Sequence, residues 1–124
     1  MRSLPISALP EVRERIGDAE VTLKAEISRI KKILTDPAAT LPLSLAEFTV
    51  REAKNSLDLL AVHSRQLTQW QKEAISDAER VEVVRLQTLV PQIRPLIQRL
   101  IALATELEKR ARTGAVSRRK TWRH

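Results

Sequence analysis

Apolar residues in the C-terminal third of the chain recur at steps of three and four residues. They are Val83, Leu86, Val90, Ile93, Ile97, Leu100, Ala104, Leu107 and Ala111. This spacing predicts a helix over 77–112 that buries one continuous seam. Leu89, Leu96 and Leu103 repeat every seven residues beside the seam, so the apolar stripe is wide enough to face two neighbouring helices.

The same three-and-four spacing appears near the N-terminus and in the middle of the chain. The first set predicts a helix over 9–35 and comprises Val12, Ile16, Ala19, Leu23, Ile27, Ile30 and Leu34. The second predicts a helix over 45–75 and comprises Ala46, Val50, Ala53, Leu57, Leu60, Leu67 and Ala74. Polar Ser64 and Gln71 take two seam positions of the second helix, so its packing is expected to loosen toward residue 71.

Two capping boxes mark the expected ends of the connections. Ser44 and Glu47 predict a helix start at Leu45, with Leu43 and Phe48 at the positions of a hydrophobic staple. Ser76 and Glu79 form a second box, where the seam of the second helix goes out of phase with that of the third. Neither glycine nor proline supports this second break, so one long bent helix stays open as an alternative to a hairpin.

Pro91 and Pro95 lie inside the third predicted helix, on the outer side of its seam. Each removes a backbone donor and clashes with the preceding turn. Because the seam keeps its phase across both, the pattern favours a single helix kinked near Pro91 and Pro95. The kink follows the curvature of the core or opens a groove for a partner. Gly114 is expected to end the helix.

These elements together predict an all-α fold, an antiparallel up-down-up bundle of three long helices. Residues 1–8 form an extended lead-in, 9–112 a single helical-bundle domain and 113–124 a basic C-terminal tail. Leu89, Leu96 and Leu103 either complete the internal core or form a self-association face that makes the protein a homo-oligomer.

Composition supports this fold class. The chain has 124 residues, 2% aromatic residues, two glycines and no cysteine, which is poor material for sandwiches or barrels and excludes disulfides and thiolate metal sites. It contains no apolar run long enough for a membrane span and no signal-peptide core, so a cytoplasmic location is expected.

Residues able to carry chemistry are few. His63 is the only histidine in the body, and no carboxylate lies three or four residues away. It is therefore interpreted as an ordinary surface histidine, without the partners of a triad or the glutamate of a di-iron site. Gly17 and Gly114 are isolated and form no phosphate-binding loop. No catalytic residue, cofactor, metal or small-molecule substrate is expected.

Positive charge is concentrated at the C-terminal end. The net charge is +7, and 113–124 hold four basic residues and no acidic one. The candidate contacts to an anionic partner or nucleic acid are Arg118, Arg119, Lys120, Trp122 and Arg123, which combine cations with an aromatic face able to stack on a base. A structural or solubilising tail, and contact with an acidic protein or a lipid surface, are the other readings.

Trp70 lies on the second predicted helix, and two interpretations of its position are open. It is buried at the edge of the bundle, or it is exposed as a hot spot for a partner. The sequence as a whole favours a non-enzymatic adaptor or assembly protein that acts through protein–protein contacts. The alternative is a nucleic-acid-binding accessory protein that uses the basic tail.

Overall fold

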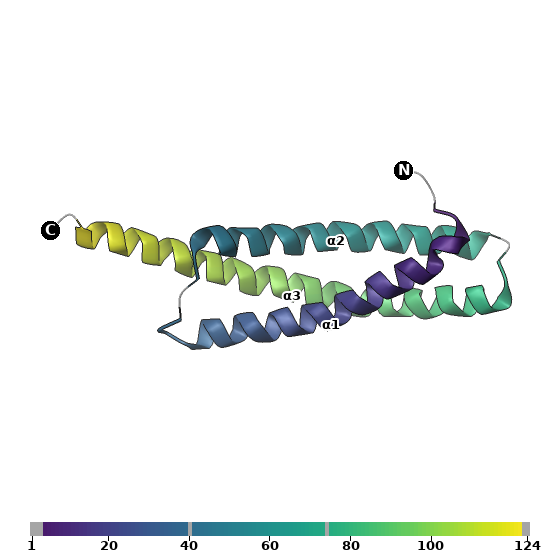
Figure 1. Ribbon diagram of the computed structural model, residues 1–124, viewed down its shortest axis with the longest axis horizontal. Coiled ribbons are helices and arrows are strands. Elements are labelled where there is room, and N and C mark those ends of the chain that lie inside the picture. The colour runs from purple at the N-terminus through teal and green to yellow at the C-terminus, as the bar shows by residue number, and fades with distance from the viewer. Residues whose placement is uncertain (1–3, 40, 74, 123–124) are drawn as a thin grey trace.

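The computed structural model describes residues 4–39, 41–73 and 75–122, with side chains as far as residue 114. Three helices follow a short 3₁₀ turn at Ile6–Ala8. They are α1 (Leu9–Thr35), α2 (Leu43–Lys72) and α3 (Asp77–Trp122). Figure 1 shows that they run antiparallel, with α2 opposite in direction to α1 and α3. The predicted up-down-up bundle is therefore confirmed.

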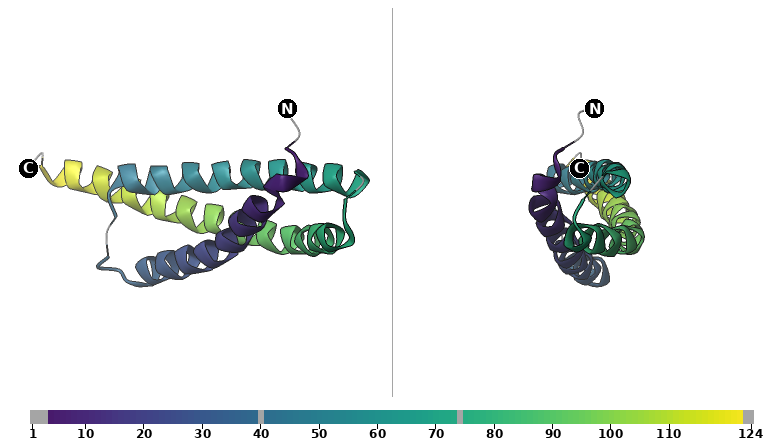
Figure 2. Two further views of the ribbon diagram at one scale, coloured as in Figure 1. Left: turned by 45° about the vertical axis from the view of Figure 1, so that its right-hand side comes forward. Right: turned by 90° about the vertical axis from the view of Figure 1, so that its right-hand side faces the viewer.

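α3 is the helix on which the other two rest. Both α1 and α2 pack against α3 along their lengths, whereas α1 crosses the bundle at an angle. Its N-terminal end lies beside the C-terminal end of α2, and its C-terminal end diverges from the start of α2 (Figure 1 and Figure 2). Two of the three possible helix interfaces are thus well developed.

The predicted seam of α3 is the core of the bundle. Its buried members are Val83, Leu86, Val90, Ile93, Ile97, Leu100, Ala104 and Leu107. Leu89, Leu96 and Leu103 are partly buried and pack against this core. Pro91 and Pro95 are exposed, and α3 passes through both without a break while its axis bends (Figure 1). Proline is tolerated here because its missing N–H lies on the solvent side.

The second capping box forms as predicted and separates α2 from α3. The Ser76 N–H donates to Glu79 Oε1 at 2.9 Å, and the Glu79 N–H donates to Ser76 Oγ at 3.2 Å. These bonds satisfy backbone donors that the first turn of α3 leaves without partners. The bond from the Ser76 N–H, and then the Ser76 side chain, hold the pKa of the Glu79 carboxyl below its ordinary value. The hairpin is confirmed, and the single long helix is excluded.

We expect Ser76→Ala to lower the free energy of unfolding by about 1 kcal/mol, the usual cost of removing a capping hydroxyl. The reason is that the Glu79 N–H loses its acceptor at the start of α3. Urea denaturation followed by circular dichroism measures the change. Ser76→Asp is the control, because aspartate also accepts a capping bond. Equal losses in both variants would show that the cap is not the cause.

The first capping box was wrong. α2 begins at Leu43, two residues early, with Pro42 in the N-cap position and no side-chain cap. The Pro42 carbonyl accepts from the N–H groups of Leu45 and Ala46 at 3.0 and 3.1 Å, which places Ser44 inside the first turn. Phe48 is exposed and forms no hydrophobic staple. It lies instead beneath the Arg51 guanidinium, 5.7 Å from the ring centre.

The predicted helix end at Gly114 was also wrong, because α3 continues to Trp122. A glycine ends a helix by taking a left-handed conformation, and within the described chain no glycine has a positive φ. A Cβ at Gly114 would meet nothing within 4 Å. The residues that follow include alanine, arginine and lysine, which are good helix formers, and no proline, so nothing local stops the helix.

Arg110 fastens the diverging end of α1 to α3. Its Nη1 donates to the carbonyls of Ile33 and Leu34 at 3.0 and 3.3 Å, and its Nη2 donates to the carbonyl of Asp36 at 2.6 Å. The last carbonyls of a helix have no partners within the helix. The Leu34 carbonyl gains its partner from Arg110, and the Ile33 and Asp36 carbonyls, which also accept from the N–H groups of Asp36 and Ala39, gain a second one. One guanidinium thus holds the end of α1 where α1 and α2 are apart.

Candidate functional site

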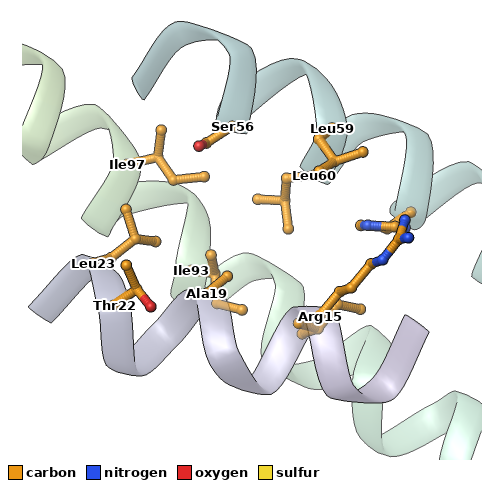
Figure 3. Close-up of a pocket in the computed structure, with 11 residues that line it drawn as sticks. Arg15, Ala19, Thr22, Leu23, Ser56, Leu59, Leu60, Ile93 and Ile97 are labelled. Atoms are coloured by element: carbon orange, nitrogen blue, oxygen red, sulfur yellow. The ribbon is translucent and has the colours of Figure 1, made fainter. Parts of the chain in front are cut away.

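A cavity of about 130 Å³ lies where α1 crosses α2, above the middle of α3. Figure 3 shows side chains from all three helices converging on it. The lining consists of Arg15, Ile16, Ala19, Thr22 and Leu23 from α1, Ser56, Leu59, Leu60 and His63 from α2, and Ile93 and Ile97 from α3. Each helix contributes positions three or four apart, the spacing of one helix face.

Two of the four polar side chains that line the cavity, Ser56 and Arg15, form hydrogen bonds within their own helices. The Ser56 hydroxyl donates to the carbonyl of Glu52 at 3.0 Å. The Arg15 Nη2 donates to Glu11 Oε1 on its own helix at 2.7 Å, and its side chain extends from α1 toward α2 (Figure 3). The lining contains no aspartate or glutamate. The cavity is thus apolar, with a cation at its edge.

The predicted surface position of His63 was wrong. The residue is only 6% exposed, and among the described residues its Nε2 has no hydrogen-bond partner. Burial, and then the positive charge of Arg15, lowers the pKa of the imidazole below its ordinary value of 6.5. His63 is therefore neutral at pH 7, with a desolvated nitrogen that lacks the partner such groups normally have.

We expect stability to fall as the pH drops below about 6.5, the unfolded pKa of histidine. Below that pH the unfolded chain binds a proton at His63 that the folded chain resists, because the folded pKa is lower. The loss grows until the pH passes the folded pKa. Urea unfolding of wild type and His63→Leu between pH 5 and 7.5 measures it, and the profile of the variant should be flatter.

His124→Gln, which removes the other histidine of the chain, is the matched control for this pH profile. It should keep the wild-type slope. If His63→Leu and wild type lose stability in parallel, the folded imidazole is not desolvated. The substitution itself should be close to neutral at pH 7.5, since an apolar side chain replaces a polar group without a partner.

Beyond His63, the N-terminal segment covers the same side of α2. The Leu4 N–H donates to Gln66 Oε1 at 2.7 Å, and the Leu4 carbonyl accepts from Trp70 Nε1 at 2.9 Å. Trp70 is 0% exposed, which excludes the exposed hot spot. The expected loosening of α2 was wrong as well, because Leu67 and Trp70 are both fully buried close to Gln71.

The face of α2 that is covered near its C-terminal end is exposed to solvent near its N-terminal end. Positions 45, 48, 52, 56, 59, 63, 66 and 70 follow one another at steps of three and four, so they share the face that looks toward α1. His63, Gln66 and Trp70 are buried there, whereas Leu59, Phe48 and Leu45 are 47%, 46% and 43% exposed. The difference arises because α1 leaves α2 in this direction (Figure 2).

The tail residues Arg118, Arg119, Lys120 and Trp122 lie on the last turns of α3, and their side chains are outside the described part of the chain. Arg123 lies beyond the described residues altogether. The candidate tail contacts therefore stay a prediction. Self-association through Leu89, Leu96 and Leu103 stays a prediction, although their packing against the core reduces the surface they offer.

Sequence reasoning missed the cavity and the burial of His63. The signal that was present is the repeat of His63, Gln66 and Trp70 at helical spacing, parallel to the seam of α2.

Among the residues that the structure describes, no cluster of histidine and acidic side chains could hold a metal ion. Within the same residues, none of the helices has the length and apolarity that crossing a membrane requires. Searches of protein-family models, curated proteins and solved structures gave no match to the chain.

Proposed function

We propose that this protein is a non-enzymatic helical-bundle adaptor that binds a partner protein through the uncovered face of α2, formed by Leu45, Phe48 and Leu59. The single observation that supports this function is the exposure of three large apolar side chains on the α1-facing side of α2. Toward the C-terminal end of α2 the same side is buried at His63, Gln66 and Trp70. Isolated exposed apolar residues are ordinary, but a row of them along one helix face is typical of an interaction site.

The chemistry of this face fits an amphipathic helix of the partner. Leu45 and Phe48 lie one turn apart, and Leu59 lies on the same side further along α2, beyond the polar Glu52 and Ser56. A second helix could therefore pack along α2 with a pair of apolar anchors at one end and a third further along. Arg51 lies over the Phe48 ring at 5.7 Å, which adds a cation and an aromatic surface, a combination enriched where binding energy is concentrated. The cavity lining offers no acid to pair with His63, so catalysis has less support.

A photo-crosslinking amino acid at position 48 tests the proposal in the full-length chain. We expect a discrete crosslinked partner from position 48 and none from position 54, since Lys54 is exposed but lies off the α1-facing side. Leu45→Ser in the same chain should weaken the crosslink, whereas Asn55→Ser should not. Identical products from both positions, or a product containing only a second copy of this chain, would contradict an adaptor role.

The extension of α3 favours nucleic-acid binding as a second candidate function. α3 continues past the start of α2, so its last turns project from the bundle (Figure 1). They carry the cations of the tail, which would neutralise phosphates and release counterions on binding. Removing residues 115–124 should abolish a salt-dependent affinity for single-stranded nucleic acid while leaving the unfolding curve unchanged. Absence of binding by the intact chain at low salt would exclude this function.

A further inference from the structure

We propose that the cavity between α1 and α2 is a binding site for a small aromatic molecule that carries one hydroxyl group. This inference does not depend on the proposed adaptor function. It starts from His63 Nε2, which is buried beside the cavity and has no hydrogen-bond partner among the described residues. A buried polar atom in this state costs free energy that a bound group could recover.

The size and lining of the cavity select the apolar part of the ligand. Its volume is about 130 Å³, and cavities of about 150 Å³ lined by aliphatic side chains accommodate a benzene ring. Ile16, Leu23 and Leu60 meet Ile93 and Ile97 around it. These branched side chains supply contact on several sides of a flat ring and no competing hydrogen bonds. A single aromatic ring therefore matches the space.

The imidazole selects the polar part of the ligand. His63 is neutral at pH 7, and its Nε2 carries a proton in one tautomer and a lone pair in the other. A hydroxyl group both donates and accepts, so it can satisfy Nε2 in either tautomer. A carboxylate can only accept and an ammonium ion can only donate, and either ion would lose its hydration among the aliphatic side chains of the cavity. A cationic ligand would also be repelled by Arg15, which lies close enough to influence His63.

The cavity is open beside Leu59, which lines it and is 47% exposed, and Arg15 lies at its edge near His63. Nε2 is covered in this conformation, and the Arg15 side chain extends across the edge of the cavity toward α2 (Figure 3). This side chain is 58% exposed and is bonded to Glu11, one turn earlier on the same helix. Exposed pairs of this kind contribute little to stability. The arginine can therefore swing outward without disturbing the helices, which opens a path to the imidazole.

Phenol and toluene test the proposal, because the two probes differ in the hydroxyl group and share the ring. Both are titrated into the full-length protein labelled with ¹⁵N in histidine, and His124→Gln identifies which imidazole signals belong to His63. We expect phenol to shift the His63 Nε2 signal saturably and toluene to leave it in place. In His63→Leu the ratio of phenol affinity to toluene affinity should fall about tenfold, the factor that corresponds to one net hydrogen bond.

Ile97→Phe is the second variant, since it fills the cavity and should remove the binding of both probes. An unchanged affinity ratio in His63→Leu, or a His63 signal that does not respond to phenol, would overturn the proposal. Persistent binding of both probes in Ile97→Phe would place them outside the cavity and would overturn it too. If His63→Leu fails to fold, the spectrum of the wild-type protein still decides, because the Nε2 signal is read directly.

Discussion

Trp70→Ala is expected to destabilise the protein by about 3–5 kcal/mol, the usual cost of truncating a large buried aromatic side chain. Trp70 is 0% exposed and donates its indole N–H to the carbonyl of Leu4 at 2.9 Å. Truncation removes the ring from the end of α2 and leaves that carbonyl with a weaker partner. Since small domains have a total stability of about 5–15 kcal/mol, a large fraction of the protein should be unfolded at modest urea concentrations.

Urea unfolding followed by circular dichroism at 222 nm measures the effect of Trp70→Ala without relying on tryptophan fluorescence. Trp70→Phe separates the two contributions, because it keeps an aromatic ring and removes the N–H donor. Its loss should be clearly smaller. The exposed neighbour Gln69 gives a control, and Gln69→Ala should change stability by less than about 0.5 kcal/mol. Equal effects at positions 69 and 70 would contradict the burial of the indole.

Leu86→Ala should lower the free energy of unfolding by about 2–5 kcal/mol, because the lost side chain leaves a cavity that surrounding helices can only partly fill. Leu86 is 0% exposed and belongs to the seam of α3 that both other helices contact. The same urea titration measures the change. Leu86→Met, which nearly conserves volume, should cost less than about 1.5 kcal/mol.

Val84→Ala is the matched control for Leu86→Ala, since Val84 lies two residues away on α3 and is 47% exposed. It should change stability by less than about 0.5 kcal/mol. A large effect at Val84 together with a small effect at Leu86 would mean that α3 packs with a different face. That result would also remove the basis for assigning the seam from its three-and-four spacing.

The sequence predicted the architecture because its signals were local and repeated. The seam of α3 repeats over many positions between Val83 and Leu107, and each one independently reports the buried face. The break before α3 was predictable because Ser76 and Glu79 interact with each other's backbone. Such features need no knowledge of the rest of the chain. The seam and the second capping box were confirmed, whereas the box of Ser44 and Glu47 was overridden by Pro42, which starts α2 two residues earlier.

The candidate site could not be predicted in the same way, because it depends on contacts between distant segments. His63 and Trp70 are buried by α1 and the N-terminal segment, and the hydrogen bond between Trp70 and Leu4 joins residues 66 positions apart. The angle at which α1 crosses α2 decides where that cover ends. No local pattern encodes this angle. The sequence places Phe48 and His63 on the same face of α2, and it does not show that Phe48 is exposed and His63 is buried.

The two ends of α1 make different contacts, and this difference affects how the helix can move. α1 packs on α3 along its length, but only its first half also lines the cavity with α2, and its end is held to α3 by the hydrogen bonds from Arg110. Lifting the last turns of α1 from the bundle breaks fewer contacts than global unfolding does, so amide protons there should exchange with solvent through local opening. The protein would then behave as a rigid pair of helices carrying a third that hinges at one end.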